Sequence, residues 1–280
     1  NDLQNLLGDK EVLFFPSSYK RPYEFEETEN ANILQRAEIL NRINNKASSG
    51  ELIVTYPDAL TEKVINKKSL VANTFTAKVG ESVDVEFLTE LFVTYGFVQD
   101  DFVFEPGQFS VRGGIVDIYS YAGELPVRLE LFGDEIESIR TFDPESQLSK
   151  DHLKTVNIIP NVQTKLIEEK RDSFFDFIPN NSKIWIKDYE HTTDVLEKYY
   201  LKAEASFDKI LEASGTDSLV LKPDYLFETK ESFIGSIQKY VKIEFGNRFY
   251  LEGSELFQFE SSPQPSFNKN FELIAESLES

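Results

Sequence analysis

The order of apolar and polar positions in the first 69 residues predicts a layer of strands and helices. An apolar run at 11–15, closed by Pro16, is typical of a buried strand, and Leu52-Ile53-Val54 is a second such run. Between them, apolar side chains recur at spacings of three and four over 30–45, which predicts an amphipathic helix. A strand, a helix and a strand in this order indicate part of an α/β fold.

From about residue 70 to residue 157, the pattern becomes that of an antiparallel sheet with one helix. Asp84 is a typical N-cap residue, and it predicts a helix that ends at Tyr95 with Gly96 after it. Two-residue alternation predicts strands at 74–79, 102–104, 114–119, 127–132 and 135–142. Because Gly133-Asp134 is a hairpin signal, the last two strands should pair directly. We therefore expect an α+β domain built on an antiparallel sheet.

After about residue 158 the α/β pattern returns. We expect helices at 168–177, at 192–213 and from Asn270 onward, and strands at 183–187, 241–245 and 256–259. The predicted fold class is therefore α/β. Its predicted regions are a first α/β piece (1–69), an inserted α+β domain (70–157) and a second α/β piece that packs on the first (158–280).

The composition narrows the possible functions. The chain has 280 residues and no Cys, which excludes a disulfide framework, a thiolate zinc site and a cysteine nucleophile. Lys and Arg supply 29 charges against 49 from Asp and Glu, so the formal net charge is −20. Such a chain repels a phosphate backbone over most of its surface, so we expect no sequence-independent DNA binding. The sequence has no signal peptide and no stretch typical of a membrane helix, so we expect a cytoplasmic location and no membrane partner.

No arrangement of residues in the sequence points to a catalytic centre. The sequence lacks a phosphate-binding loop of the type G-x-x-x-x-G-K-[ST] and a nucleophile elbow of the type G-x-S-x-G. Its two histidines, His152 and His191, lie in acidic surroundings and are better interpreted as solvated surface residues. The acidic residues show no calcium-loop spacing, and 188–191 is better interpreted as a helix N-terminus than as a metal cluster. We therefore expect no catalytic residue, no cofactor and no metal in this chain.

The strand predicted at 127–132 carries an unusual pair of side chains. With a period of two, Arg128 and Phe132 lie on one face, and Leu129 lies on the opposite, buried face. An arginine and a large aromatic residue on one exposed face form a combination that is enriched in binding hot spots. We expect Arg112 to reach the same patch from a neighbouring strand, although Gly113-Gly114 prevents parity from fixing its direction.

The same residues also fit a purely structural interpretation. In that case Arg112 and Arg128 pair with Glu130 or Asp117 across the sheet, and Phe132 lies beneath a neighbouring loop. If instead the face binds a partner, replacing Arg128 or Phe132 by Ala should weaken binding and leave folding nearly unchanged. The properties of the residues alone leave both interpretations open.

The most informative stretch runs from 105 to 149. It contains Glu105-Pro106-Gly107-Gln108-Phe109, Arg112-Gly113-Gly114, Asp117, Arg128, Phe132-Gly133-Asp134-Glu135-Ile136-Glu137-Ser138 and Phe142-Asp143. These motifs resemble the amino-terminal region of the family of bacterial transcription-repair coupling factors (Mfd), which contains a module similar to domain 2 of the excinuclease B subunit. The flanking stretches 14–21 and 265–271 also resemble this family, so the resemblance covers nearly the whole chain.

The resemblance implies a decayed helicase-like α/β body in two sequence pieces, with an inserted domain that binds the excinuclease A subunit. It further implies that this domain recruits the A subunit to RNA polymerase stalled at DNA damage. The positions that match the family's contact residues are Arg112, Arg128 and Phe132. The motor that uses ATP and Mg, and the parts that contact RNA polymerase and duplex DNA, would follow Ser280. Because the chain begins at Asn1 and has no Met, we expect it to be a fragment without enzyme activity of its own.

An alternative is a fragment of the excinuclease B subunit itself, an ATP-dependent protein that binds damaged DNA. That subunit has a phosphate loop and a long, Tyr-rich hairpin that grips DNA. Here the interval between Phe15 and Leu52 holds only Tyr19 and Tyr23, and it is acidic at 24–29. This departure favours the coupling factor.

Overall fold

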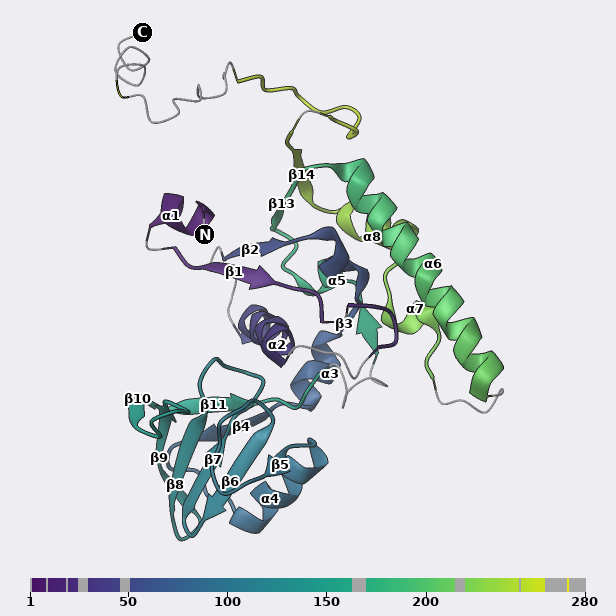
Figure 1. Ribbon diagram of the computed structural model, residues 1–280. Coiled ribbons are helices and arrows are strands. Elements are labelled where there is room, and N and C mark those ends of the chain that lie inside the picture. The colour runs from purple at the N-terminus through teal and green to yellow at the C-terminus, as the bar shows by residue number, and fades with distance from the viewer. Residues whose placement is uncertain are drawn as a thin grey trace. The chain divides into compact units, whose positions relative to one another are not determined.

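The computed structural model describes residues 2–8, 10–18, 20–24, 30–45, 51–162, 170–214, 220–246, 248–259 and 271. Helices and strands are mixed in them, as the sequence predicts (Figure 1). Backbone contacts divide the chain into two units, residues 1–249 and residues 250–280. The boundaries suggested by the sequence near 69/70 and 157/158 fall inside the first unit and stay a prediction.

A parallel pair of strands lies near the start of the first unit. Strand β1 (Val12–Phe15) pairs with β2 (Leu52–Thr55), and helix α2 (Asn30–Asn45) lies between them in the sequence. Phe15 on β1 and the inner face of α2 share one apolar core, so this predicted strand–helix–strand order is confirmed. The remaining elements here are α1 (Asp2–Leu7), the 3-10 helix η2 (Pro57–Thr61), β3 (Val64–Ile65) and α3 (Lys67–Ala72).

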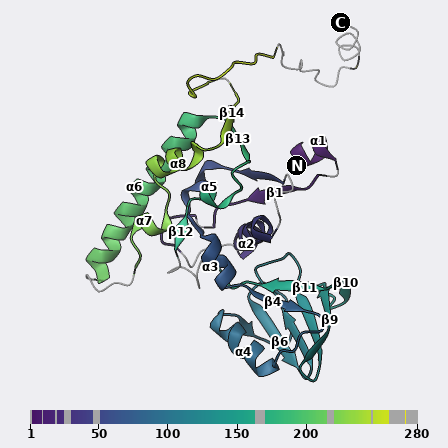
Figure 2. The same ribbon diagram turned by 180° about the vertical axis from the view of Figure 1, so that it is seen from behind.

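A second parallel pair comes later in the chain. Strand β13 (Lys183–Ile186) pairs with β14 (Val241–Glu244), and the long helix α6 (Tyr189–Ser214) follows β13 close to its predicted bounds. Strand β12 (Arg171–Asp172) pairs with β3, which joins this part to the N-terminal part. The shorter helices are α5 (Phe174–Phe177), α7 (Pro223–Leu226) and α8 (Lys230–Ile237), and α8 lies beside α6 in both views (Figures 1 and 2).

Between these two parts the chain forms a six-stranded sheet with the order β10-β9-β8-β7-β6-β5. Its neighbours are antiparallel except for β5 and β6, which run parallel. The strands are β5 (Val98–Gln99), β6 (Gln108–Arg112), β7 (Ile115–Ile118), β8 (Val127–Phe132), β9 (Glu135–Phe142) and β10 (Ser149–Leu153). A separate antiparallel pair is formed by β4 (Phe75–Lys78) and β11 (Thr155–Ile158). The predicted α+β character of this segment is confirmed.

Helix α4 (Val85–Thr94) covers one face of the six-stranded sheet. The Asp84 side chain accepts a hydrogen bond from the backbone N–H of Glu86 at 2.7 Å, which caps the helix as predicted. Gly96 follows the helix with a φ of +76°, a conformation that glycine adopts readily. Phe92 on the inner side of α4 packs edge-on against Phe109 of β6, so the core lies between α4 and the sheet.

Three predicted elements differ in the structure. No strand forms at 102–104, because the Gln108 side chain accepts the backbone N–H groups of Phe104 and Glu105 at 2.8 and 2.9 Å. Of the helix predicted at 168–177, the described residues 170–177 form only the single turn α5, which begins after the cap residue Ser173. Residues 163–169 lie outside the described residues.

The third difference is the strand predicted at 256–259. These residues have no regular secondary structure and pair with no strand in the described part of the chain, so they do not form a ladder. The helix predicted from Asn270 falls almost entirely outside the described residues, of which Phe271 alone is described and is helical. None of the helices in the described part of the chain has the length and apolar character that a bilayer crossing requires.

Candidate functional site

The six-stranded sheet has two unlike faces. One packs on α4 and carries buried apolar side chains such as Leu129. The opposite face, called the polar face from here on, carries Ser110, Arg112, Asp117, Arg128, Glu130, Phe132 and Arg140. Ser110, Asp117, Arg128 and Arg140 form one row across it, because each is the direct cross-strand neighbour of the next. The row therefore brings side chains from four strands together.

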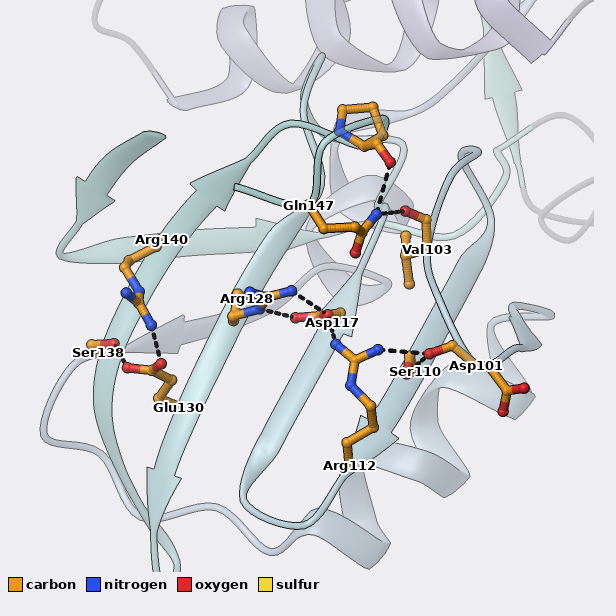
Figure 3. A network of polar contacts seen from close by, with 11 residues as sticks. Asp101, Val103, Ser110, Arg112, Asp117, Arg128, Glu130, Ser138, Arg140 and Gln147 are labelled. Carbon is orange, nitrogen blue, oxygen red and sulfur yellow. Dashed lines mark hydrogen bonds and ion pairs between the residues drawn. The ribbon is translucent and has the colours of Figure 1, made fainter. Parts of the chain in front are cut away.

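Asp117 on β7 is the centre of the polar face. Its side chain is 0% exposed, and it accepts three hydrogen bonds from two arginines (Figure 3). Arg128 donates from Nε to Oδ1 at 2.7 Å and from Nη2 to Oδ2 at 2.8 Å, and Arg112 donates from Nη2 to Oδ2 at 2.5 Å. Because Arg112 belongs to β6 and Arg128 to β8, one carboxylate fixes guanidinium groups from both flanking strands. These bonds raise the pKa of Arg128 above its ordinary value, against the opposing effect of burial.

Arg112 is held on its other side by the loop that precedes β6. Its Nη1 donates to the carbonyl oxygen of Asp101 at 2.6 Å, and Ser110 Oγ donates to the same oxygen at 3.0 Å (Figure 3). The guanidinium also lies over the ring of Phe102, 5.0 Å from the ring centroid. Arg112 is thus held by a carboxylate, a carbonyl and an aromatic ring, while its side chain stays 36% exposed.

Arg128 lies above a small apolar cluster. Its guanidinium carbon is 4.8 Å from the ring centroid of Phe142, which is buried together with Val103 and Tyr119. Gln147 holds this arrangement from the turn after β9, because its Nε2 donates to the carbonyl of Val103 at 3.1 Å (Figure 3). The Arg128 side chain is 16% exposed. The expectation that Arg128 is a fully exposed side chain is therefore wrong, and its effect on folding stays a prediction.

The Arg112–Asp117–Arg128 cluster carries excess positive charge although the chain as a whole is strongly acidic. Arg112 and Arg128 share the single carboxylate of Asp117, so one positive charge is not neutralised within this cluster. Next to it, Glu130 accepts hydrogen bonds from Arg140 Nη2 and from Ser138 Oγ and forms a separate, neutral pair. A partly exposed guanidinium without a full counter-charge favours an anionic partner group.

Phe132 is the most exposed residue of β8, with 81% of its surface accessible. It ends the strand at a hairpin in which Gly133 has a φ of +62°. The β8–β9 pairing shifts by one residue between Glu130 and Leu131, and the extra residue, Glu137, belongs to β9. Alternation along β8 is therefore intact, and Phe132 lies on the same face as Arg128, as predicted.

Each of the two interpretations of the sequence is right in part. Arg112 and Arg128 do pair with Asp117 across the sheet, as the structural interpretation expects. Phe132 does not lie beneath a loop, contrary to that interpretation. The expectation that Arg112 comes from a strand next to β8 is wrong, because β7 lies between β6 and β8 and Asp117 bridges the gap. That Arg112, Arg128 and Phe132 bind a partner stays a prediction.

Sequence reasoning missed the aromatic residues that border this face. Phe102 and Phe104 are both about half exposed, and their rings lie 6.4 Å apart. Their apolar character suggested a strand, but the Pro106-Gly107 turn signal directly after them argues for a loop. Phe102 in particular extends the exposed aromatic surface beside Arg112.

The described residues contain no cluster of three or more His, Asp and Glu side chains arranged to hold a metal ion. His152 and His191 are both exposed, in agreement with their interpretation as surface residues. The arrangement on the polar face offers charge, hydrogen-bond donors and an exposed ring. Such groups suit recognition of another macromolecule.

Comparison with known proteins identifies the segment that carries the polar face. Residues 75–163 match the family of the UvrB interaction domain. This range begins at β4, ends after β11 and contains the whole six-stranded sheet. The predicted module similar to domain 2 of the excinuclease B subunit is therefore confirmed.

Larger parts of the chain are similar to transcription-repair-coupling factors. That of Bacillus subtilis (strain 168) is 29% identical over 237 residues, which are 84% of this chain and 20% of that protein. Those of Myxococcus xanthus and Staphylococcus aureus (strain MRSA252) are each 34% identical, over 57% and 59% of this chain and 13% and 14% of those proteins. The chain thus spans about a fifth or less of the length of these relatives. Its predicted resemblance to the N-terminal region of transcription-repair-coupling factors is confirmed.

Proposed function

We propose that this chain is a non-catalytic part of a transcription-repair coupling factor, and that its polar face binds the excinuclease A subunit. In this proposal, binding recruits nucleotide excision repair to RNA polymerase stalled at DNA damage. The ATP- and Mg-dependent motor, and the contacts to RNA polymerase and duplex DNA, belong to other parts of the parent protein. The two parallel strand pairs with α2 and α6 correspond in this proposal to the decayed helicase-like body.

The observation that carries the proposal is the exposed ring of Phe132, which lies on the same face as the Arg112–Asp117–Arg128 cluster, four residues along β8 from Arg128. A phenylalanine that is 81% exposed leaves a large apolar surface in water, and burying it against a partner is favourable. Hot spots combine such a ring with arginines that are held in place before binding. The match of residues 75–163 to the UvrB interaction domain supports a repair protein as the partner.

The chemistry of the polar face also suggests what the partner presents. The positive charge of Arg112 and Arg128 that Asp117 does not neutralise favours a carboxylate on the partner, because guanidinium groups bind carboxylates through paired hydrogen bonds. The exposed ring of Phe132 favours an apolar pocket on the partner, opposite the end of β8. We therefore expect the A subunit to use an acidic side chain next to an apolar recess.

The proposal is tested by calorimetric titration of the full chain with the purified excinuclease A subunit. Phe132→Ala should weaken binding by about 2 kcal/mol or more, which is about a 30-fold rise in Kd. Phe87→Ala is the matched control, because Phe87 is a half-exposed phenylalanine of the same segment but lies on α4, which covers the opposite face. The control should bind like the wild type.

Two results would contradict the proposal. One is the absence of measurable binding by the wild-type chain at concentrations of tens of micromolar. The other is a Phe132→Ala variant with wild-type affinity while Phe87→Ala loses affinity, which would move the contact to the α4 side. Melting curves of all variants establish that each is folded at the assay temperature.

A further inference from the structure

We infer that Asp117, which is itself buried, is a positioning residue of this docking site, and this inference rests on the proposed function. Asp117 has no exposed surface with which to touch a partner. It does determine where both arginines lie, because all three of its side-chain hydrogen bonds described here go to their guanidinium groups. Its expected role is to hold Arg112 and Arg128 in the geometry that the partner's anionic group requires.

The hydrogen bonds to Asp117 restrict the movement of both guanidinium groups. Arg128 uses Nε and Nη2 on the two different oxygens of Asp117, a fork that fixes the plane of its guanidinium. Arg112 takes one of the same oxygens with Nη2, and its Nη1 reaches the carbonyl of Asp101. Both side chains are long and flexible, so the loss of their freedom on binding would otherwise weaken association. In this structure that freedom is already lost on folding.

A purely structural role for Asp117 accounts less well for the cluster. Buried ion pairs are weak contributors to stability, and well-packed apolar residues often replace them without loss. The opposite face of the same sheet shows that this chain builds an apolar core where packing alone is needed, as at Leu129. The two arginines, in contrast, remain partly exposed, with 16% and 36% of their side chains accessible. A charge cluster that is buried at its carboxylate and open at its guanidinium groups is suited to presenting those groups.

Positioning and simple attraction predict opposite effects of Asp117→Asn. The substitution removes the negative charge and leaves both arginines positive, so a site that works by attraction alone would bind an acidic partner more tightly. If Asp117 acts by positioning, the same variant binds more weakly despite its larger positive charge. A merely structural residue would change the melting temperature without changing the affinity of the folded protein.

The experiment is a calorimetric titration of the full chain and its variants with the excinuclease A subunit at two salt concentrations, with melting curves alongside. Asp117→Asn should raise Kd at least tenfold. In a background with Arg112→Ala and Arg128→Ala, the added Asp117→Asn change should alter Kd by less than twofold, because nothing is left to position. Asp117→Glu keeps the negative charge and both arginines but moves the carboxylate by one methylene group, so it should also lose at least tenfold. This variant leaves the charge of the cluster unchanged and keeps the test decisive if Asp117→Asn does not fold.

The outcomes separate the two proposals. If the wild-type chain does not bind the A subunit, the proposed function fails and the positioning role fails with it. If the wild type binds but folded Asp117→Asn or Asp117→Glu binds within twofold of it, or more tightly, the positioning role alone is overturned. An equal loss from Asp117→Asn with and without the two arginines would also overturn it.

Discussion

Replacing Arg128 by alanine should loosen the sheet itself, whereas replacing Phe132 should not. Arg128 supplies two of the three hydrogen bonds that Asp117 accepts, and the Asp117 carboxylate is fully buried. In the variant, Arg112 is the one described cation left to balance that charge. Phe132 lies at the end of the same strand with its ring in water, so its removal changes little inside the domain.

The expected sizes of the two effects differ widely. Removing one partner of a buried ion pair costs about 3–5 kcal/mol. Because Arg112 remains and water can enter where Arg128 was, we expect a loss of about 2–3 kcal/mol, which is about a 30- to 150-fold increase in the opening equilibrium of the sheet. Surface substitutions such as Phe132→Ala stay within about 0.5 kcal/mol, or about twofold.

Hydrogen exchange followed by mass spectrometry measures this opening directly in the full chain. Peptides that cover β7, β8 and β9 should exchange faster by the stated factor in Arg128→Ala and at nearly the wild-type rate in Phe132→Ala. The fluorescence of Trp185, the only tryptophan, would not report on this sheet because it lies in β13. The reasoning is refuted if Arg128→Ala changes exchange less than threefold, or if Phe132→Ala changes it more than tenfold.

Five further predictions concern stability and the binding of nucleotide and DNA. Leu129→Ala should lower the unfolding free energy by about 2–5 kcal/mol, because this side chain is fully buried, and local hydrogen exchange measures the loss. Gly114→Ala should lower the melting temperature, because an added Cβ would lie 2.6 Å from the carbonyl oxygen of Leu131, while Gly123→Ala, with nothing within 4 Å, should not. Burial raises the pKa of Glu228 above 4.5, so its charge opposes folding increasingly as pH rises from about 4.5 to that raised value. Glu228→Gln should therefore gain more in melting temperature over the wild type at pH 8 than at pH 4.5, and an equal or smaller gain at pH 8 would contradict this. Millimolar Mg-ATP should not raise the melting temperature, and duplex DNA should give no gel shift at physiological salt, whereas salt-sensitive micromolar DNA binding would contradict the charge argument.

Much of the sheet could be predicted because its signals are local. Alternation along β8 separates Leu129 from Arg128 and Phe132, and the glycine of the hairpin is visible directly after Phe132. Helix α4 could be predicted equally well, since its cap at Asp84 and its end near Gly96 are each set by one residue. These features depend on neighbours within a few positions of the chain.

The Arg112–Asp117–Arg128 cluster could not be predicted from the sequence. Which of Glu130 and Asp117 pairs with the arginines depends on the register of three strands, and the sequence separates Asp101 from Asp117 by a whole hairpin. The failed strand at 102–104 has a local origin instead, because the nearby Gln108 side chain takes the backbone N–H groups that a ladder would use. Long-range strand pairing therefore decided the contacts of Asp117, whereas the loop at 102–104 depends on neighbours within four residues.

Photo-crosslinking from position 132 tests most directly whether the polar face is where the excinuclease A subunit binds. Phe132 is replaced by the photoreactive p-benzoyl-phenylalanine in the full chain, with the same replacement at Phe87 on α4 as the control. On irradiation with the A subunit, position 132 should give a covalent adduct that maps to one limited surface of that subunit, and position 87 should give none. Binding that is seen by calorimetry but yields no adduct from position 132, or equal adducts from both positions, would contradict the account.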